Sequence, residues 1–190
     1  MNQEEIDRLI QKTQTKDTLK QLFDLQVDQR VERWLKVRPH NIIPNSHFAG
    51  VSMETYELYR DGYYYGAISL SQSVAEALVR FICEKNDESH SSYENALQKL
   101  KRRGLLDDQL LDKFTAIRQS RNDYHHLNPS IEREREALDI LATEKLQALQ
   151  EIETELFAYT TNDGKISPKY EQYWDADVAS GTMEVYLRID

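Results

Sequence analysis

The 190-residue chain is poor in cysteine, glycine and proline, with one, six and four of these residues. The single cysteine, Cys83, cannot form an internal disulfide and offers no cysteine-based zinc site. So few glycines and prolines exclude a collagen-like or disordered chain. No apolar run approaches the roughly 20 residues that span a bilayer, and the first residues lack the basic start and apolar stretch of a signal peptide. We therefore expect a cytoplasmic protein that holds no metal or cofactor and contacts no membrane.

Excess positive charge is also missing, since 24 basic and 33 acidic side chains give a net charge of −9. This balance argues against a dedicated nucleic-acid protein, whose affinity comes largely from lysine and arginine on phosphates. The charge is uneven, however: residues 1–95 sum to −4, residues 127–190 to −8 and residues 96–126 to +3. The basic segment contains Lys99, Lys101, Arg102, Arg103, Lys113, Arg118 and Arg121. Such a strip can guide a phosphate to one place, although an ordinary solvated helix face has the same composition.

Apolar residues recur at offsets of three and four along most of the chain, which predicts an all-α fold. Glycine and proline interrupt the pattern and mark the ends of the expected helices. These helices cover residues 2–12, 17–37, 52–60, 67–82, 92–103, 107–128 and 131–159, and the last is expected to be the longest.

The end of the chain has a different pattern. From Thr182 to Asp190 apolar and polar residues alternate, which predicts a β-strand with Met183, Val185, Leu187 and Ile189 on one side. Four large apolar side chains on one side are unstable in water, so this strand should pair. Its partner is expected near Ile42–Ile43 or in another chain.

The domain organisation follows from a loop at residues 39–52, which contains two prolines, two asparagines and a glycine. We expect an N-terminal helical extension at residues 1–52 and a helical bundle at residues 53–160. Residues 161–190 are expected to form a C-terminal tail that contains the strand.

The familiar catalytic motifs are absent: the sequence has no Gly-rich phosphate loop, no G-x-S-x-G motif and no zinc-protease helix motif. Residues 118–129 instead combine two arginines, an aspartate, a tyrosine, two asparagines and two histidines. Such polar density between apolar helices is costly unless it is exposed or used. A helix-capping and turn role is the alternative to a functional one.

Within this segment, Arg121-Asn-Asp-Tyr-His-His126 forms an R-N-x-x-x-H motif that resembles the signature of HEPN domains (higher eukaryotes and prokaryotes nucleotide-binding). Upstream, Tyr59-Arg-Asp-Gly-Tyr-Tyr-Tyr-Gly-Ala-Ile68 leads into a helix with Glu76 and is similar to the family's Ala-rich helix. The resemblance covers about residues 53–160. It implies a HEPN-like helical bundle that dimerises and places two arginine–histidine pairs in a cleft at the dimer interface.

Many members of this family are metal-independent endoribonucleases of toxin–antitoxin pairs or antiviral defence, and others are inactive binding modules. On this resemblance the catalytic residues are Arg121 and His126. The expected supporting residues are Asn122, Asp123, His125 and Glu76. Weaker RNA-binding candidates are Lys101, Arg102, Arg103 and Arg118.

The choice of histidine depends on where the helix ends. In an unbroken helix Arg121 shares a face with His125, four residues later, whereas His126 is rotated by about 140° from it. If the helix ends near Asn122, or if the cleft is built across a dimer, His126 can serve. The spacing of the family favours His126, with His125 in reserve.

The chemistry can also be argued from the residue types. Attack by the 2′-hydroxyl of RNA needs a base, an acid and positive charge on the phosphate. Histidine takes either protonation state near neutral pH, and arginine grips two phosphate oxygens. A homodimer supplies two histidines. We therefore expect a metal-independent endoribonuclease, a toxin or antiviral defence effector, that acts on RNA and leaves a 2′,3′-cyclic phosphate. An antitoxin or another protein regulator is a further expected partner. The alternative is a catalytically silent module that binds a nucleotide, RNA or a protein.

Overall fold

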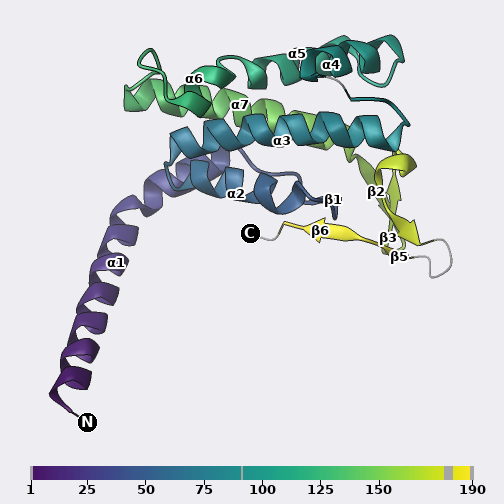
Figure 1. Cartoon of the computed structure of the whole chain (residues 1–190). Helices are drawn as coiled ribbons and strands as arrows, with labels where there is room; N and C mark the ends of the chain where they lie inside the picture. Colours follow the sequence, from purple (N-terminus) through teal and green to yellow (C-terminus); the bar gives the residue numbers. More distant parts are fainter. Residues whose placement is uncertain (1, 91, 178–181, 189–190) are drawn as a thin grey trace. The chain divides into compact units, whose positions relative to one another are not determined.

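The computed structural model of the chain describes residues 2–90, 92–177 and 182–188 and divides it into two compact units, Met1–Lys36 and Val37–Asp190. Helices make up most of it, which confirms the all-α class with short strands near the C-terminus (Figure 1). The helices are α1 (Gln3–Lys36), α2 (Ala49–Arg60), α3 (Tyr64–Lys85), α4 (Tyr93–Arg102), α5 (Asp108–Arg118), α6 (Arg121–His126) and α7 (Arg135–Leu156). None of those described is long and apolar enough to cross a membrane.

The first unit is the single helix α1, where the sequence predicted two helices with a break after residue 12. No glycine or proline occurs between the two predicted segments. The hydroxyls of Thr13 and Thr15 donate to the carbonyls of Leu9 and Gln11, one turn earlier, and so add side-chain bonds to the helical backbone. As a result α1, and not the helix after residue 131, is the longest one described.

The second unit is organised around α3, which packs against α2, α4, α5, α6 and α7 (Figure 1). Because α3 has neighbours on most sides, its buried residues extend beyond the predicted stripe and include the polar side chains of Ser71 and Gln72. The amphipathic helix α4 begins at Ser92, whose hydroxyl accepts from the backbone of Asn95. Asp107 accepts from the backbone of Leu110, which confirms the predicted N-cap of α5.

The helix predicted over residues 107–128 is wrong as a continuous element. It ends at Arg118, and a second, six-residue helix, α6, follows it. Ser120 lies between them at φ 59°, a left-handed conformation that no residue inside an α-helix adopts. Leu127, at φ 51°, ends α6 two residues before Pro129. The break therefore isolates the R-N-x-x-x-H segment as a helix of its own.

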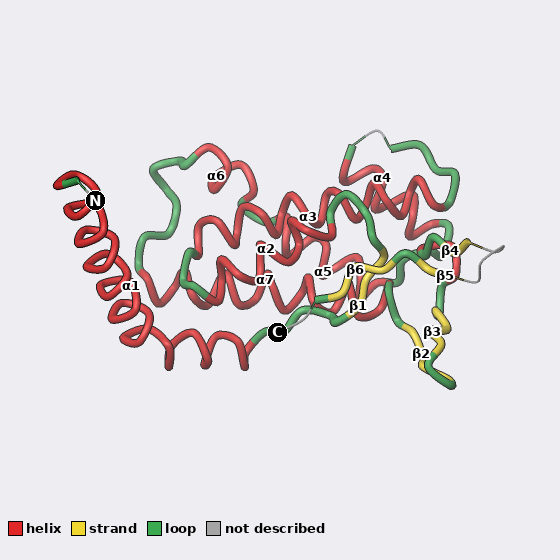
Figure 2. The backbone as a smooth tube through the Cα atoms, turned by 90° about the horizontal axis from the view of Figure 1, so that it is seen from below, coloured by secondary structure: helices red, strands yellow, loops and turns green. Residues whose placement is uncertain are grey.

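The predicted C-terminal strand pairs with the segment at Ile42–Pro44, one of the two partners that the sequence left open. β6 (Val185–Leu187) is antiparallel to β1 (Ile42–Pro44), with Ile43 opposite Tyr186. The other strands are β2 (Tyr159–Asn162), β3 (Lys165–Pro168), β4 (Ala176–Asp177) and β5 (Thr182–Met183), and a 3-10 turn, η1 (Glu171–Tyr173), precedes β4. In Figure 2 these elements, β2 to β5, lie at the end of the second unit away from α6.

The apolar side of the predicted strand is not its buried side. Val185 and Leu187 are 37% and 53% exposed, whereas Arg188 is 4% exposed. The reason is a buried glutamate, Glu153 of α7, which forms an ion pair with Arg188. Ile189 lies outside the described residues.

The expected domain limits also differ from the compact units. Ile43, Phe48 and Ala49 are buried in the core of the second unit, so the N-terminal extension ends at Lys36 and not at residue 52. Residues after 160 belong to the same core, because Tyr173 and Trp174 are buried in it. Aromatic rings from before and after residue 160 pack together there: the ring of Phe157 lies edge-on to that of Trp174, with 6.2 Å between the centroids.

Candidate functional site

The candidate site is built on α6, which is held against α3 by one buried side chain. Tyr124 is 5% exposed, and its ring lies 6.3 Å from that of Tyr65 on α3. The Tyr65 hydroxyl donates to the carbonyl of Glu132 at 2.9 Å, so the segment after α6 is fixed to the same tyrosine. With Tyr124 facing inward, the arginine and the two histidines of α6 lie on its outer sides.

Arg121 and Arg118 meet at one carboxylate, that of Glu76 on α3. Arg121 Nε donates to Glu76 Oε1 at 2.6 Å, and Arg118 Nη1 donates to the same oxygen. Arg80 lies 3.9 Å from the other oxygen of Glu76. The three main side chains are 18–31% exposed, so the cluster lies at the edge of solvent. The predicted position of Glu76 beside the motif is confirmed as a contact, and we name Glu76, Arg118 and Arg121 the Glu76 cluster.

Arg118 extends this cluster toward α4. Its guanidinium lies over the ring of Tyr93, 4.6 Å from the centroid, and its Nε is 3.4 Å from a carboxylate oxygen of Glu94. A groove between α4 and α5 reaches the same arginine and is lined mainly by Tyr93, Leu97, Leu111 and Gln119. The cluster therefore has an apolar surface on one side and α6 on the other.

The two histidines lie at the last positions of α6, and both are exposed. Because the helix is continuous from Arg121 to His126, His125 follows Arg121 by one turn and shares its face. Partial burial, followed by the positive charge of Arg121, lowers the pKa of His125, and Glu76 opposes this shift. His126, five residues after Arg121, is rotated by about 140° from it and so lies off this face.

Asp123 and Asn128 hold the end of α6. Asn128 Nδ2 donates to Asp123 Oδ1 at 2.8 Å, and the backbone N–H of Asn128 donates to the Asp123 carbonyl. Asp123 thus helps to close the C-terminal end of α6. Asn122, the other predicted supporting residue, accepts a long bond of 3.4 Å from Arg121 Nη1.

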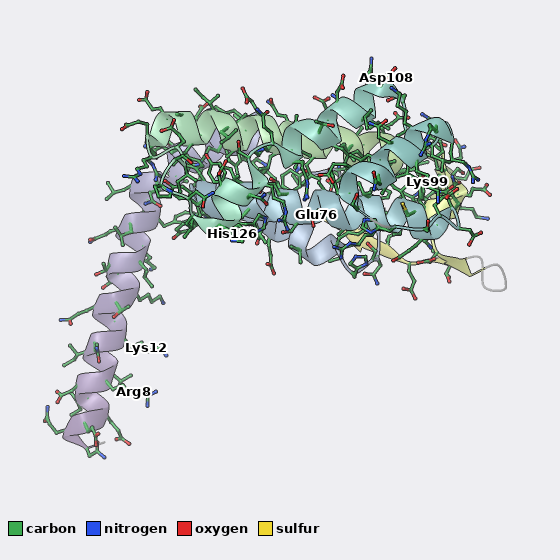
Figure 3. The ribbon with its side chains drawn as sticks, turned by 45° about the horizontal axis from the view of Figure 1, so that its top comes forward. Arg8, Lys12, Glu76, Lys99, Asp108 and His126 are labelled. Carbon is green, nitrogen blue, oxygen red and sulfur yellow. The ribbon has the colours of Figure 1, made fainter. Side chains whose placement is uncertain are left out.

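The basic strip is not continuous in space. α4 and α5 run in opposite directions, so Lys101, Arg102 and Arg103 lie at the end of this hairpin far from α6. Figure 3 shows the same separation between Lys99 or Asp108 and His126. Lys101 also pairs with Asp108, and Arg103 with Glu88. Of the weaker RNA-binding candidates, the structure brings only Arg118 to the motif.

The sequence interpretation missed two buried cations among the described residues of the second unit. Arg188 is bound by Glu153, and Lys145 of α7, 2% exposed, donates to three backbone carbonyls near the end of α5. A charged residue inside the apolar seam of α7 was the available signal for Glu153 and Lys145. The helical period alone does not show which polar residues of a helix face inward, so this signal does not identify the two side chains as buried.

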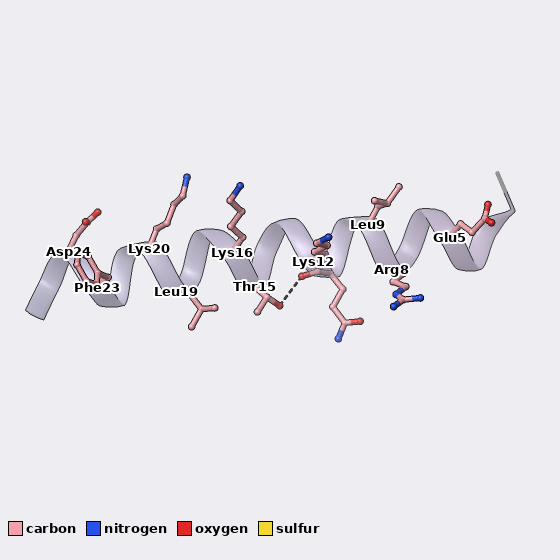
Figure 4. Close-up of a pocket in the computed structure, with 11 residues that line it drawn as sticks. Glu5, Arg8, Leu9, Lys12, Thr15, Lys16, Leu19, Lys20, Phe23 and Asp24 are labelled. Atoms are coloured by element: carbon pink, nitrogen blue, oxygen red, sulfur yellow. Dashed lines mark hydrogen bonds between the residues drawn. The ribbon is translucent and has the colours of Figure 1, made fainter. Parts of the chain in front are cut away.

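A further hollow lies outside the candidate site. A large open groove follows one side of α1 alone and is lined by Arg8, Leu9, Lys12, Leu19 and Phe23 among others (Figure 4). It contains none of the predicted site residues. Among the residues that the structure describes, no group of three or more histidine, cysteine, aspartate or glutamate side chains could hold a metal ion.

Comparison with known proteins adds no family to this description. No protein-family model matches the chain, and no curated protein or solved structure matches it. The resemblance to HEPN domains therefore stays a prediction that rests on the residues of the motif.

Proposed function

We propose that this protein is a metal-independent endoribonuclease of HEPN type whose active site is built on α6. The observation that carries the proposal is the arrangement of Arg121 at the first position of α6 and His125 and His126 at the last two, all accessible to solvent. Glu76 binds the Nε edge of Arg121. Among the described residues Arg121 Nη2 makes no hydrogen bond, so this nitrogen can donate to a phosphate oxygen.

The proposed reaction needs only these groups. A neutral histidine takes the proton of the 2′-hydroxyl, and O2′ forms a bond to phosphorus. The bond from phosphorus to O5′ breaks, and a protonated histidine gives its proton to O5′. The products are a 2′,3′-cyclic phosphate and a 5′-hydroxyl. Arg121 stays charged throughout and stabilises the negative charge that develops on the phosphate.

The second histidine of the proposed reaction comes from a second copy of the chain. Apolar side chains are exposed at the start of α3 and at the end of α6, with Tyr63 and Leu127 at 65% and 66%. Covering them in a homodimer would remove apolar surface from water and bring two copies of α6 together. In this arrangement His126, which points away from Arg121 of its own chain, faces the site of the other.

A binding module is the second candidate, and one observation favours it. Both arginines of the Glu76 cluster are already paired with carboxylates, Arg118 with two of them. A phosphate must share or displace these partners, which lowers its affinity. A silent module of this kind would bind a nucleotide, RNA or a protein without cutting it. For the nuclease we propose a role as a toxin or antiviral defence effector under the control of an antitoxin or another protein regulator.

The test is cleavage of single-stranded RNA by the purified wild-type chain and three alanine variants. Arg121→Ala and His126→Ala should each lower the cleavage rate by about 100-fold or more. His125→Ala, a matched control one residue away, should lower it less. Excess EDTA should leave the rate unchanged. If wild-type protein cuts no RNA and does not slow growth when expressed, the binding-module candidate replaces the nuclease. Loss in His125→Ala alone would move the proton transfer to His125.

A further inference from the structure

We propose that Lys145, a buried lysine of α7, is the positioning residue of the α6 site, because it holds the turn that separates α6 from α5. The proposal deepens the proposed function but does not depend on RNA cleavage. It concerns a side chain that lies on another helix and does not touch the Glu76 cluster or the histidines.

The geometry matches the donors of a lysine to three acceptors. Lys145 Nζ donates to the carbonyls of Ala116, Ile117 and Gln119 at 3.1, 2.8 and 2.9 Å. An ammonium group has three N–H donors, so each is used once. Among the described residues no carboxylate pairs with Nζ, although Glu144 acts on it from a distance. All three N–H donors of this buried cation therefore bind backbone carbonyls at the end of α5.

These carbonyls need a donor because α5 stops there. The last carbonyls of an α-helix have no amide partner one turn ahead, and a cation near them also interacts favourably with the helix dipole. Ser120, at φ 59°, turns the next amides away from α5. Gln72 of α3 adds a second bond to the Gln119 carbonyl, at 3.2 Å. α3 and α7 thus fix the same point of the backbone, the Gln119 carbonyl, two residues before α6 begins.

The position of this turn sets the position of the site. The Ser120 carbonyl accepts from the amides of Asp123 and Tyr124, which form the first turn of α6. Arg121 follows directly, and its contact with Glu76 depends on where α6 starts. Without the three bonds from Lys145, the Ile117 carbonyl would lose its donor, while the Ala116 carbonyl would keep only the amide of Gln119 and the Gln119 carbonyl only the amide of Gln72. The turn would then move to regain a donor for Ile117. We expect α6 to lose order while the core of α3 and α7 keeps its packing.

Two variants of Lys145 and one control separate positioning from general stability. Lys145→Met keeps the length of the side chain without its donors, and Lys145→Arg keeps donors and charge. Lys113→Met removes a lysine of α5 that pairs with Glu151 at the surface. The first measurement is the NMR titration of the His125 ring, whose pKa depends on its partial burial and on the charges of Arg121 and Glu76. The second is amide hydrogen exchange of Asp123 and Tyr124.

In Lys145→Met the His125 midpoint should rise toward its ordinary value, and protection of the two amides should fall by about tenfold or more. Amides of α3 should keep their protection. Lys145→Arg and Lys113→Met should resemble the wild type. A folded Lys145→Met variant with an unchanged His125 midpoint and unchanged protection of α6 would overturn the proposal. If this variant does not fold, scalar couplings across the bonds from Nζ to the three carbonyls in wild-type protein decide, and their absence would overturn it equally. Neither result depends on whether the protein cuts RNA.

Discussion

Two groups of arginine and glutamate side chains in the second unit have the same chemistry but differ in their exposure to solvent. Glu153 and Arg188 have side chains that are 0% exposed, and the ion pair has a bond of 2.6 Å. Ser52 and Tyr56 contribute further hydrogen bonds to the pair. Burial, and then the charge of Glu153, raises the pKa of Tyr56, which keeps its hydroxyl a donor. The Glu76 cluster has the same chemistry but stays 18–31% exposed.

The difference in exposure separates a structural role from a functional one. A buried pair cannot exchange its partner for a ligand, so Glu153 and Arg188 can only join the C-terminal strand to α2 and α7. An exposed pair is worth little to stability, and its arginine can exchange a carboxylate for a phosphate at small cost. The charge pattern of the sequence does not distinguish the two groups, since both appear there as ordinary charged residues.

The largest effect that we expect comes from breaking the buried pair. Arg188→Ala should lower the free energy of unfolding by about 3–5 kcal/mol, because Glu153 is left buried and without its ion-pair partner. Chemical denaturation followed by circular dichroism measures this loss. The double variant Glu153→Leu with Arg188→Met is the control, and it should recover most of the stability because no charge remains buried. If Arg188→Ala lowers the free energy of unfolding no more than the loss of a surface arginine does, the burial of this ion pair is contradicted.

A smaller effect concerns Lys145, a buried cation that has no carboxylate partner. Burial lowers its pKa from 10.5 to about 8. Between these two values the unfolded chain binds more protons than the folded one, so the free energy of unfolding attributable to Lys145 rises with pH from about 8 to about 10.5. The rise should total about 3 kcal/mol. The measurement is the difference between wild type and Lys145→Met in denaturant titrations at pH 7 to 10.5. A difference that stays constant over this range would show that Lys145 titrates at its ordinary pKa.

The sequence was sufficient for the helical class, for the N-cap at Asp107 and for a paired last strand, with Ile42–Ile43 as one of its two possible partners. These features depend on residues close in sequence or on a strong alternating pattern. It was not sufficient for the turn at Ser120, because that turn depends on Lys145, which lies 25 residues later and acts through bonds to the backbone. The sequence also did not show which side of the last strand is buried, because the partner of Arg188 is Glu153, which lies far away in sequence on α7.

The candidate site shows the same limit. The contact of Glu76 with Arg121 could be predicted from the helix faces, and the structure contains it. The basic strip could not be interpreted from composition alone, because the hairpin of α4 and α5 carries Lys101 and Arg103 away from Arg118 and pairs them with Asp108 and Glu88.

The smallest effect should come from breaking the exposed group. Arg121→Ala should change the free energy of unfolding by less than about 1 kcal/mol, because solvent replaces the contacts that its guanidinium makes with Glu76 and Asn122. The same denaturation experiment used for Arg188→Ala measures it, so the two arginines are compared under one set of conditions.

Glu76→Gln is the matched control from the other side of the pair. Its change should be larger than that of Arg121→Ala, because Glu76 serves two guanidinium groups and is the least exposed member of the cluster. A loss of 3 kcal/mol or more in Arg121→Ala, about the size expected for a buried pair, would mean that the cluster holds the fold together. Arg121 could then not exchange Glu76 for a phosphate at small cost, and the proposed phosphate contact would lose its physical basis.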